Sequence, residues 1–187
     1  MSDIKELIAT AISFDAARLA QEFEPDAAAM TEIREAALEV LRRFPDIPGA
    51  CAVMSAIWTA ILNDNTQYPI FAVCGDLELE GELIFGGSSP DTTSWDRGVD
   101  ITDPSWNGHC WVVFGKFIGD ISLFRTAYSS RSPRRLQVWI QNMFGPGKGL
   151  FICPNATIEQ YGLKYYARRV LSKREIDGLV KGAASYL

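Results

Sequence analysis

The chain has a single histidine, His109, and four cysteines, of which Cys51 stands where a thiol is easily activated. Cys51 follows Pro48 and lies near the start of an apolar run that predicts a helix over 49–62. A thiol at a helix start faces unpaired N–H groups and the positive end of the helix dipole, and both lower its pKa. The thiolate is the nucleophilic form, and the same N–H groups can stabilise an oxyanion on an attacked carbonyl. We therefore expect Cys51 to act as a nucleophile.

His109 and Asp120 lie on two apolar runs, 109–114 and 117–123, which predict two strands joined by a tight turn. With the turn at residues 115–116, the two polar side chains become diagonal neighbours on one face of the hairpin, within reach of each other. A carboxylate among apolar residues is unfavourable unless it has a partner. We therefore expect Asp120 to orient His109, and His109 to serve as general base and acid.

The order of these groups is a cysteine at a helix start, then His-x-Trp on a strand, then an aspartate on the next strand. Three stretches carry this order, namely 48–62, 108–115 and 117–123. In order and context they resemble the transglutaminase-like branch of the papain-like cysteine hydrolase superfamily. The resemblance covers roughly residues 48–123.

The resemblance implies an α+β fold in which an antiparallel sheet packs on a central helix that bears the nucleophile, with helices preceding it. It implies Cys51 as nucleophile, His109 as general base and acid, and Asp120 as the orienting group. No Gln or Asn stands just before Cys51, so the Cys51 backbone N–H is the expected oxyanion donor. The calcium-binding features of animal transglutaminases are not recognisable, and crosslinking is therefore not implied.

The rest of the chain supplies elements that agree with an α+β fold, helices first and antiparallel strands later. We expect one domain over 1–187, with an N-terminal helical part (1–46) and a catalytic α+β core (47–187). Periodicity predicts helices over 4–14, 25–43, 132–143 and 172–184, and strands over 69–75, 78–86, 149–153 and 160–171.

Residues 86–108 are rich in Gly, Ser, Asp, Thr and Pro, and a loop of this length in a compact domain is often a binding loop or lid. Trp95 and Trp106 are expected either to line a substrate cleft or to fill the core. Trp111 is expected to pack beside the triad and to contact substrate. The same loop holds two acids that are alternative partners for the histidine, Asp100 and Asp103.

Composition favours a globular protein in the cytoplasm. Hydrophobic residues make up 48% of the 187 residues and charged residues 22%. No apolar run approaches 18 residues, and the N-terminus lacks the basic start and apolar centre of a signal peptide, so no membrane partner is expected. Widely spaced cysteines and one histidine predict no metal and no cofactor. Cys74 and Cys110 are expected to be buried as small hydrophobes.

Charge is distributed unevenly within the net −5, since residues 1–46 carry −5, residues 47–115 carry −8 and residues 116–187 carry +8. We interpret this as acidic and basic parts that meet within one domain; a nucleic-acid site on the basic third is the alternative, which no motif supports. The leading hypothesis is a cysteine hydrolase or acyltransferase that acts on a small-molecule or peptide amide or ester through an acyl-thioester. The alternative is a catalytically inactive binding or regulatory module of the same fold.

Overall fold

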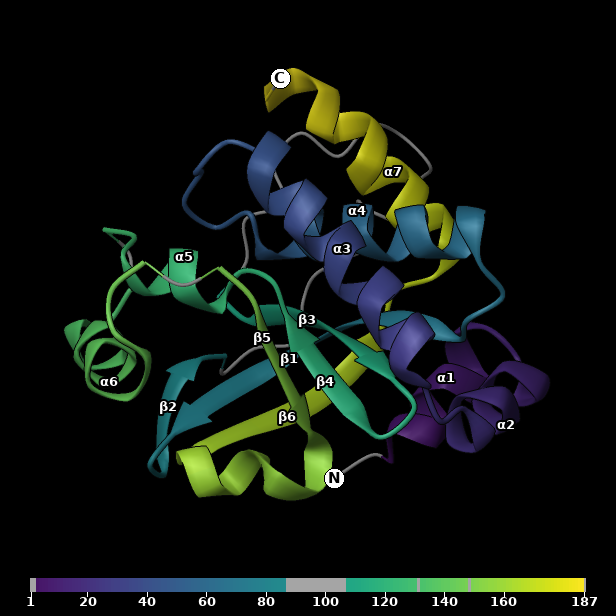
Figure 1. Ribbon diagram of the computed structural model, residues 1–187, viewed down its shortest axis with the longest axis horizontal. Helices are drawn as coiled ribbons and strands as arrows, with labels where there is room; N and C mark the ends of the chain where they lie inside the picture. Colours follow the sequence, from purple (N-terminus) through teal and green to yellow (C-terminus); the bar gives the residue numbers. More distant parts are fainter. Residues whose placement is uncertain (1–2, 87–106, 131, 148, 187) are drawn as a thin grey trace.

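The computed structural model describes residues 3–86, 107–130, 132–147 and 149–186, and within them the chain is an α+β protein built on one antiparallel sheet (Figure 1). The fold class predicted from the sequence is confirmed at this level. In chain order the elements are α1 (Ile4–Ala11), α2 (Phe14–Glu22), α3 (Ala27–Arg43), α4 (Cys51–Asn65), β1 (Ile70–Leu79), β2 (Glu82–Phe85), β3 (His109–Phe114), β4 (Phe117–Asp120), α5 (Leu123–Ala127), α6 (Arg134–Phe144), β5 (Phe151–Pro154), η2 (Asn155–Tyr161), β6 (Leu163–Val170), α7 (Lys173–Ala183) and η3 (Ala184–Tyr186).

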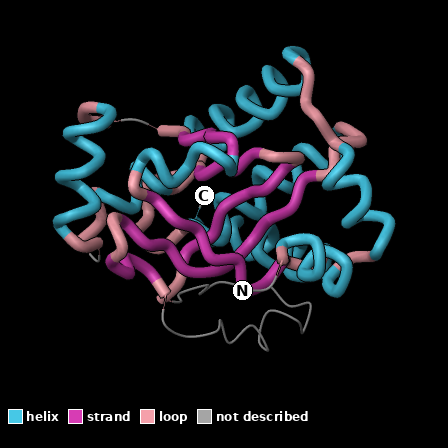
Figure 2. Tube along the Cα trace, turned by 90° about the horizontal axis from the view of Figure 1, so that it is seen from below, coloured by secondary structure: helices cyan, strands magenta, loops and turns pink. Residues whose placement is uncertain are grey.

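The long strand β1 organises the sheet. Its residues 73–79 pair with β6, while residues 70–75 pair with β3 and residues 77–79 pair with β2. A strand has only two edges, so β2 and β3 share the edge opposite β6. From β3 the sheet continues through β4 to β5. Figure 2 shows the strands side by side across the middle of the molecule, with helices around them.

Local chemistry explains where the predicted elements differ from the observed ones. The helix predicted over 4–14 ends at Ala11, and α2 follows as a helix that was not predicted. Helix α2 begins at Phe14 because the Ser13 side chain accepts a hydrogen bond from the Ala16 N–H and caps it. The strand predicted over 78–86 is a hairpin, because Glu80 and Gly81 have φ of 52° and 80°, as a type I′ turn requires. The strand predicted over 117–123 ends at Asp120, where the chain turns into α5.

Two layers of helices cover the two faces of the sheet. Helices α3, α4 and α7 pack on one face, and α4 is buried on nearly all sides, as its uniformly apolar sequence predicts. Helices α1, α2, α5 and α6 contribute to the core on the other face. Within the described residues, none of the helices is long and apolar enough to cross a membrane.

Helix α4 is fixed on the sheet by close contact between Trp58 and Gly119. A Cβ at position 119 would lie 2.4 Å from the Trp58 ring, so only glycine allows the helix to approach β4 this closely. On its other side the Trp58 ring N–H donates to the Ile33 carbonyl oxygen of α3 at 3.0 Å. The helix that begins at Cys51 is therefore held between α3 and the sheet.

Ion pairs join the basic last third of the chain to its acidic middle. Arg135 pairs with Glu80 and Glu82 at the β1–β2 turn, and Arg168 of β6 pairs with Asp76 of β1. These contacts agree with the interpretation that the acidic and basic segments meet in the fold. The alternative of a nucleic-acid site stays a prediction.

Candidate active site

His109 and Asp120 form a buried pair across the β3–β4 hairpin. Phe114 pairs with Phe117 and Val112 with Gly119, the register expected from a turn at residues 115–116. His109 Nε2 lies 2.5 Å from Asp120 Oδ2, and both side chains are at most 1% exposed. The diagonal contact expected from the sequence is therefore present.

The Asp120 carboxylate is held by several donors besides the imidazole. Its Oδ1 accepts hydrogen bonds from the Leu123 N–H at 2.8 Å and from the Ser122 N–H at 3.0 Å, and the Ser122 hydroxyl lies 3.2 Å away. Its Oδ2 also accepts from the Tyr165 hydroxyl of β6 at 2.9 Å. Because these bonds fix the orientation of the carboxylate, Asp120 can hold the imidazole in one position.

Cys51 begins α4 and is 8% exposed, whereas Cys74 and Cys110 are fully buried as expected. Among the described residues no side chain caps α4, so the N–H groups of its first turn are not taken by a cap and face the region of the thiol. The end of α3, which precedes the segment that leads into Cys51, is fastened by Arg125 of α5, which donates to the carbonyl oxygens of Leu41, Phe44 and Pro45. The first turn of α5 therefore ties the end of α3 to the strand that carries Asp120.

The electrostatics of the site favour a charged cysteine and a charged histidine. A hydrogen bond from the Cys110 thiol lowers the pKa of Cys51, burial raises it, and the His109 ring lowers it further, so that it falls well below its ordinary value. Burial lowers the pKa of His109, but the charge and hydrogen bond of Asp120, together with the Cys51 sulfur, raise it to about 10. The arrangement therefore favours a thiolate–imidazolium pair at neutral pH.

The His109 ring uses its two nitrogens differently. Nε2 is engaged by Asp120, while Nδ1 is buried and has no hydrogen-bond partner among the described residues. Cys51 and His109 each shift the pKa of the other, so the thiol and the ring are neighbours in the site. Proton-transfer contacts are often long or poorly aligned in an unliganded enzyme and tighten when substrate binds.

Aromatic rings enclose the imidazole. Phe85 of β2 stacks on His109 with ring centroids 5.6 Å apart, and Trp111 lies 6.4 Å away. Trp111 is 1% exposed and packs beside the imidazole, and its expected contact with substrate stays a prediction. The Gly86 N–H donates to the Asn107 carbonyl oxygen, which brings the two ends of the intervening segment together beside His109. Four residues considered above lie in that segment, outside the described residues: Trp95, Asp100, Asp103 and Trp106.

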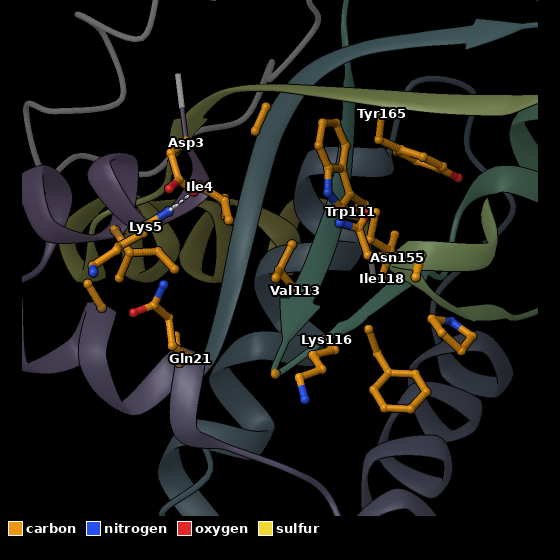
Figure 3. Close-up of a pocket in the computed structure, with 18 residues that line it drawn as sticks. Asp3, Ile4, Lys5, Gln21, Trp111, Val113, Lys116, Ile118, Asn155 and Tyr165 are labelled. Carbon is orange, nitrogen blue, oxygen red and sulfur yellow. Dashed lines mark hydrogen bonds between the residues drawn. The ribbon is translucent and has the colours of Figure 1, made fainter. Parts of the chain in front are cut away.

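A cavity of about 710 Å³ lies on the face of the sheet opposite α4, and Trp111 and Tyr165 are among the residues that line it. Figure 3 shows Asp3 and Lys5 on one side of it, Asn155 on the other, and Trp111 and Tyr165 together at one end. Neither Cys51 nor His109 lines this cavity. The cavity is connected to the site through Tyr165, which lines the cavity and also donates a hydrogen bond to Asp120.

Four residues that support the site were not singled out from the sequence. Tyr165 reaches Asp120 from a strand 45 positions later in the chain, and Arg125 and Phe85 act through contacts that depend on tertiary packing. Only Ser122, two residues after Asp120, carried a local signal, since Asp side chains often bond backbone N–H groups two positions on. The described residues contain no group of three His, Cys, Asp or Glu side chains placed to hold a metal ion.

No protein-family model matches the chain, and neither a curated protein nor a solved structure is significantly similar to it.

Proposed function

We propose that the protein is a cysteine hydrolase or acyltransferase with a Cys51–His109–Asp120 triad, related in design to the transglutaminase-like branch of the papain-like enzymes. The observation that carries the proposal is the buried imidazole, which Asp120 holds at Nε2 and whose Nδ1 has no hydrogen-bond partner among the described residues. Burial lowers the pKa of this ring, while Asp120 and the neighbouring thiol of Cys51, at the start of a helix, raise it. This is the nucleophile–base–orienter arrangement that covalent acyl transfer requires.

Each group then has one task. The Cys51 thiolate attacks the carbonyl carbon of an amide, peptide or ester, and the N–H groups of the first turn of α4 stabilise the oxyanion. The His109 imidazolium donates its proton to the leaving group as the thioester forms. Neutral His109 then removes a proton from water or an amine, which attacks the thioester and releases Cys51. Asp120 keeps the ring oriented and stabilises its charged form throughout.

The test is to trap the acyl-thioester. The protein is mixed with p-nitrophenyl acetate, and intact mass spectrometry and peptide mapping locate the acetyl group. We expect stoichiometric acetylation of Cys51 and none in Cys51→Ala. Cys153→Ala is the matched control, because Cys153 is another buried cysteine but lies on β5, outside the site. Acetylation that persists in Cys51→Ala contradicts the assignment of the nucleophile.

A second candidate is a binding or regulatory module without turnover. It is favoured by the low exposure of Cys51 and by the cavity that avoids the thiol. In that case neither p-nitrophenyl acetate nor iodoacetamide modifies Cys51 in the folded protein, while both modify it after unfolding in urea.

A further inference from the structure

Two cysteines in the core face each other across neighbouring strands. Cys74 of β1 pairs in register with Cys110 of β3, and their sulfurs lie 2.7 Å apart. Both are free thiols and both are fully buried. Directly paired residues of antiparallel strands have Cα atoms about 4.5–5.5 Å apart, within the span that a disulfide can bridge.

The third cysteine near this pair is Cys51, at the start of α4. Helix α4 packs on β1 and β3, and all three cysteines belong to the same buried cluster of side chains. The Cys110 sulfur lies 2.7 Å from that of Cys74, and Cys110 and Cys51 each shift the pKa of the other. The three sulfurs therefore form a continuous series in which Cys110 is the middle member.

The members of the series differ in access and in charge. Cys51 is 8% exposed, whereas Cys74 and Cys110 are 0% exposed, so a small oxidant reaches Cys51 first. The pKa of Cys51 lies well below its usual value, while burial and the neighbouring sulfurs raise the pKa of Cys110. Cys51 is consequently the thiolate that an oxidant attacks and the better leaving group in thiol–disulfide exchange.

We propose that Cys51, Cys110 and Cys74 form a relay that transfers oxidation by a peroxide from the nucleophile to a Cys74–Cys110 disulfide in the core. The relay rests on the proposed function, since it protects the thiol that the acyl transfer needs. It assigns Cys110 as the resolving cysteine and Cys74 as the final partner.

The chemistry balances in three steps. The Cys51 thiolate attacks one peroxide oxygen, the O–O bond breaks, and Cys51 becomes a sulfenic acid as hydroxide leaves. The Cys110 sulfur then attacks the Cys51 sulfur; the S–O bond breaks, water leaves with the Cys110 proton, and a Cys51–Cys110 disulfide forms. Finally Cys74 attacks the Cys110 sulfur, Cys51 leaves as thiolate, and the Cys74 proton neutralises the hydroxide of the first step. The net reaction reduces one peroxide to two waters and oxidises two thiols to one disulfide.

The experiment treats the full-length reduced protein with one equivalent of hydrogen peroxide, blocks the remaining thiols with N-ethylmaleimide, and maps unreduced peptides by mass spectrometry. We expect a Cys74–Cys110 disulfide and a Cys51 that is still alkylated. In Cys74→Ala the product stops at Cys51–Cys110. In Cys110→Ala no disulfide forms, and Cys51 is converted to sulfinic acid at least about 10-fold faster than in the wild type. Cys153→Ala is the control and behaves as the wild type.

Two results overturn the relay. One is conversion of wild-type Cys51 to sulfinic acid as fast as in Cys110→Ala, and the other is a disulfide that involves Cys153 or a second chain. The disulfides of the wild-type protein are mapped without any variant, so this map tests the relay even where a variant folds poorly. Acetylation of Cys51 is measured on the same reduced samples. If the Cys74–Cys110 disulfide forms but Cys51 is not acetylated, only the proposed function is contradicted. If Cys51 is acetylated but the disulfide does not form, only the relay is contradicted.

Discussion

The Tyr165 hydroxyl donates to the same Asp120 oxygen that lies 2.5 Å from the His109 ring. One carboxylate oxygen thus contacts both the imidazole and the tyrosine hydroxyl, while the other accepts hydrogen bonds from two backbone N–H groups. Because the phenol approaches from β6, the orientation of His109 depends on a strand that belongs to neither arm of the β3–β4 hairpin.

Tyr165→Phe removes this hydroxyl and leaves the ring in place. Hydrogen bonds to charged groups contribute about 1.5–3 kcal/mol, so we expect the free energy of unfolding in urea to fall by that amount. The matched control is Tyr166→Phe, which removes a hydroxyl bonded to the more exposed Glu78 and should cost about 1 kcal/mol or less. Equal losses of unfolding free energy in the two variants would mean that the hydrogen bond to Asp120 contributes no more to stability than the one to Glu78.

The pH dependence of acyl transfer should show two limbs with different origins. Because the pKa of Cys51 is lowered, its thiolate is already present below the pH where ordinary thiols ionise. Because the pKa of His109 is raised to about 10, the imidazolium acid is lost only as pH rises through about 10. We expect acylation to fall above that pH, while alkylation by iodoacetamide, which needs only the thiolate, does not fall. Parallel alkaline limbs in the two reactions would argue against His109 as the acid.

Asp120→Asn should move the alkaline limb. The carboxylate raises the pKa of His109 through its charge and its hydrogen bond, so removing the charge should lower that pKa towards the ordinary value of about 6.5. We expect the acylation rate at neutral pH to fall by about 100-fold or more, since loss of an orienting aspartate can cost about 10⁴-fold. His109 is the only histidine of the chain, so NMR titration of its ring reports the shift without assignment. An unchanged ring pKa would contradict the pairing.

Arg125→Met tests the fastening of the segment before Cys51. The guanidinium donates to three carbonyl oxygens, and leaving them without this donor should lower the free energy of unfolding by about 2–3 kcal/mol. The control is Arg134→Met, at an exposed position of α6, where we expect a change within about 0.5 kcal/mol. If the segment positions the thiol, acylation of Cys51 should also slow in Arg125→Met at temperatures where the variant is fully folded.

The sequence predicted the elements that local pattern determines. A run that is apolar nearly all round identified α4, two apolar runs and a tight turn identified the β3–β4 hairpin, and counting from that turn placed His109 beside Asp120. Helix α2 was missed because the apolar pattern of α1 continues to Phe14, past the end of α1 at Ala11 and past Ser13, which caps α2.

Contacts between distant segments could not be predicted from pattern. The local sequence does not distinguish Tyr165 from other tyrosines in strands, because its contact with Asp120 requires the pairing of β6 with β1. The approach of Trp58 to Gly119 likewise depends on how α4 packs on the sheet. The pairing of Cys74 with Cys110 likewise needs the β1–β3 register, because 36 residues separate the two cysteines.

Burial of α4 on nearly all sides has a consequence for how the protein loses function. A nucleophile on a surface loop can be displaced by local fraying while the remaining structure persists. Here the thiol is carried by the helix around which the core is assembled, so heat should abolish reactivity and melt the domain in a single cooperative event. Amide hydrogens in the middle of this helix should accordingly exchange with solvent only through global opening.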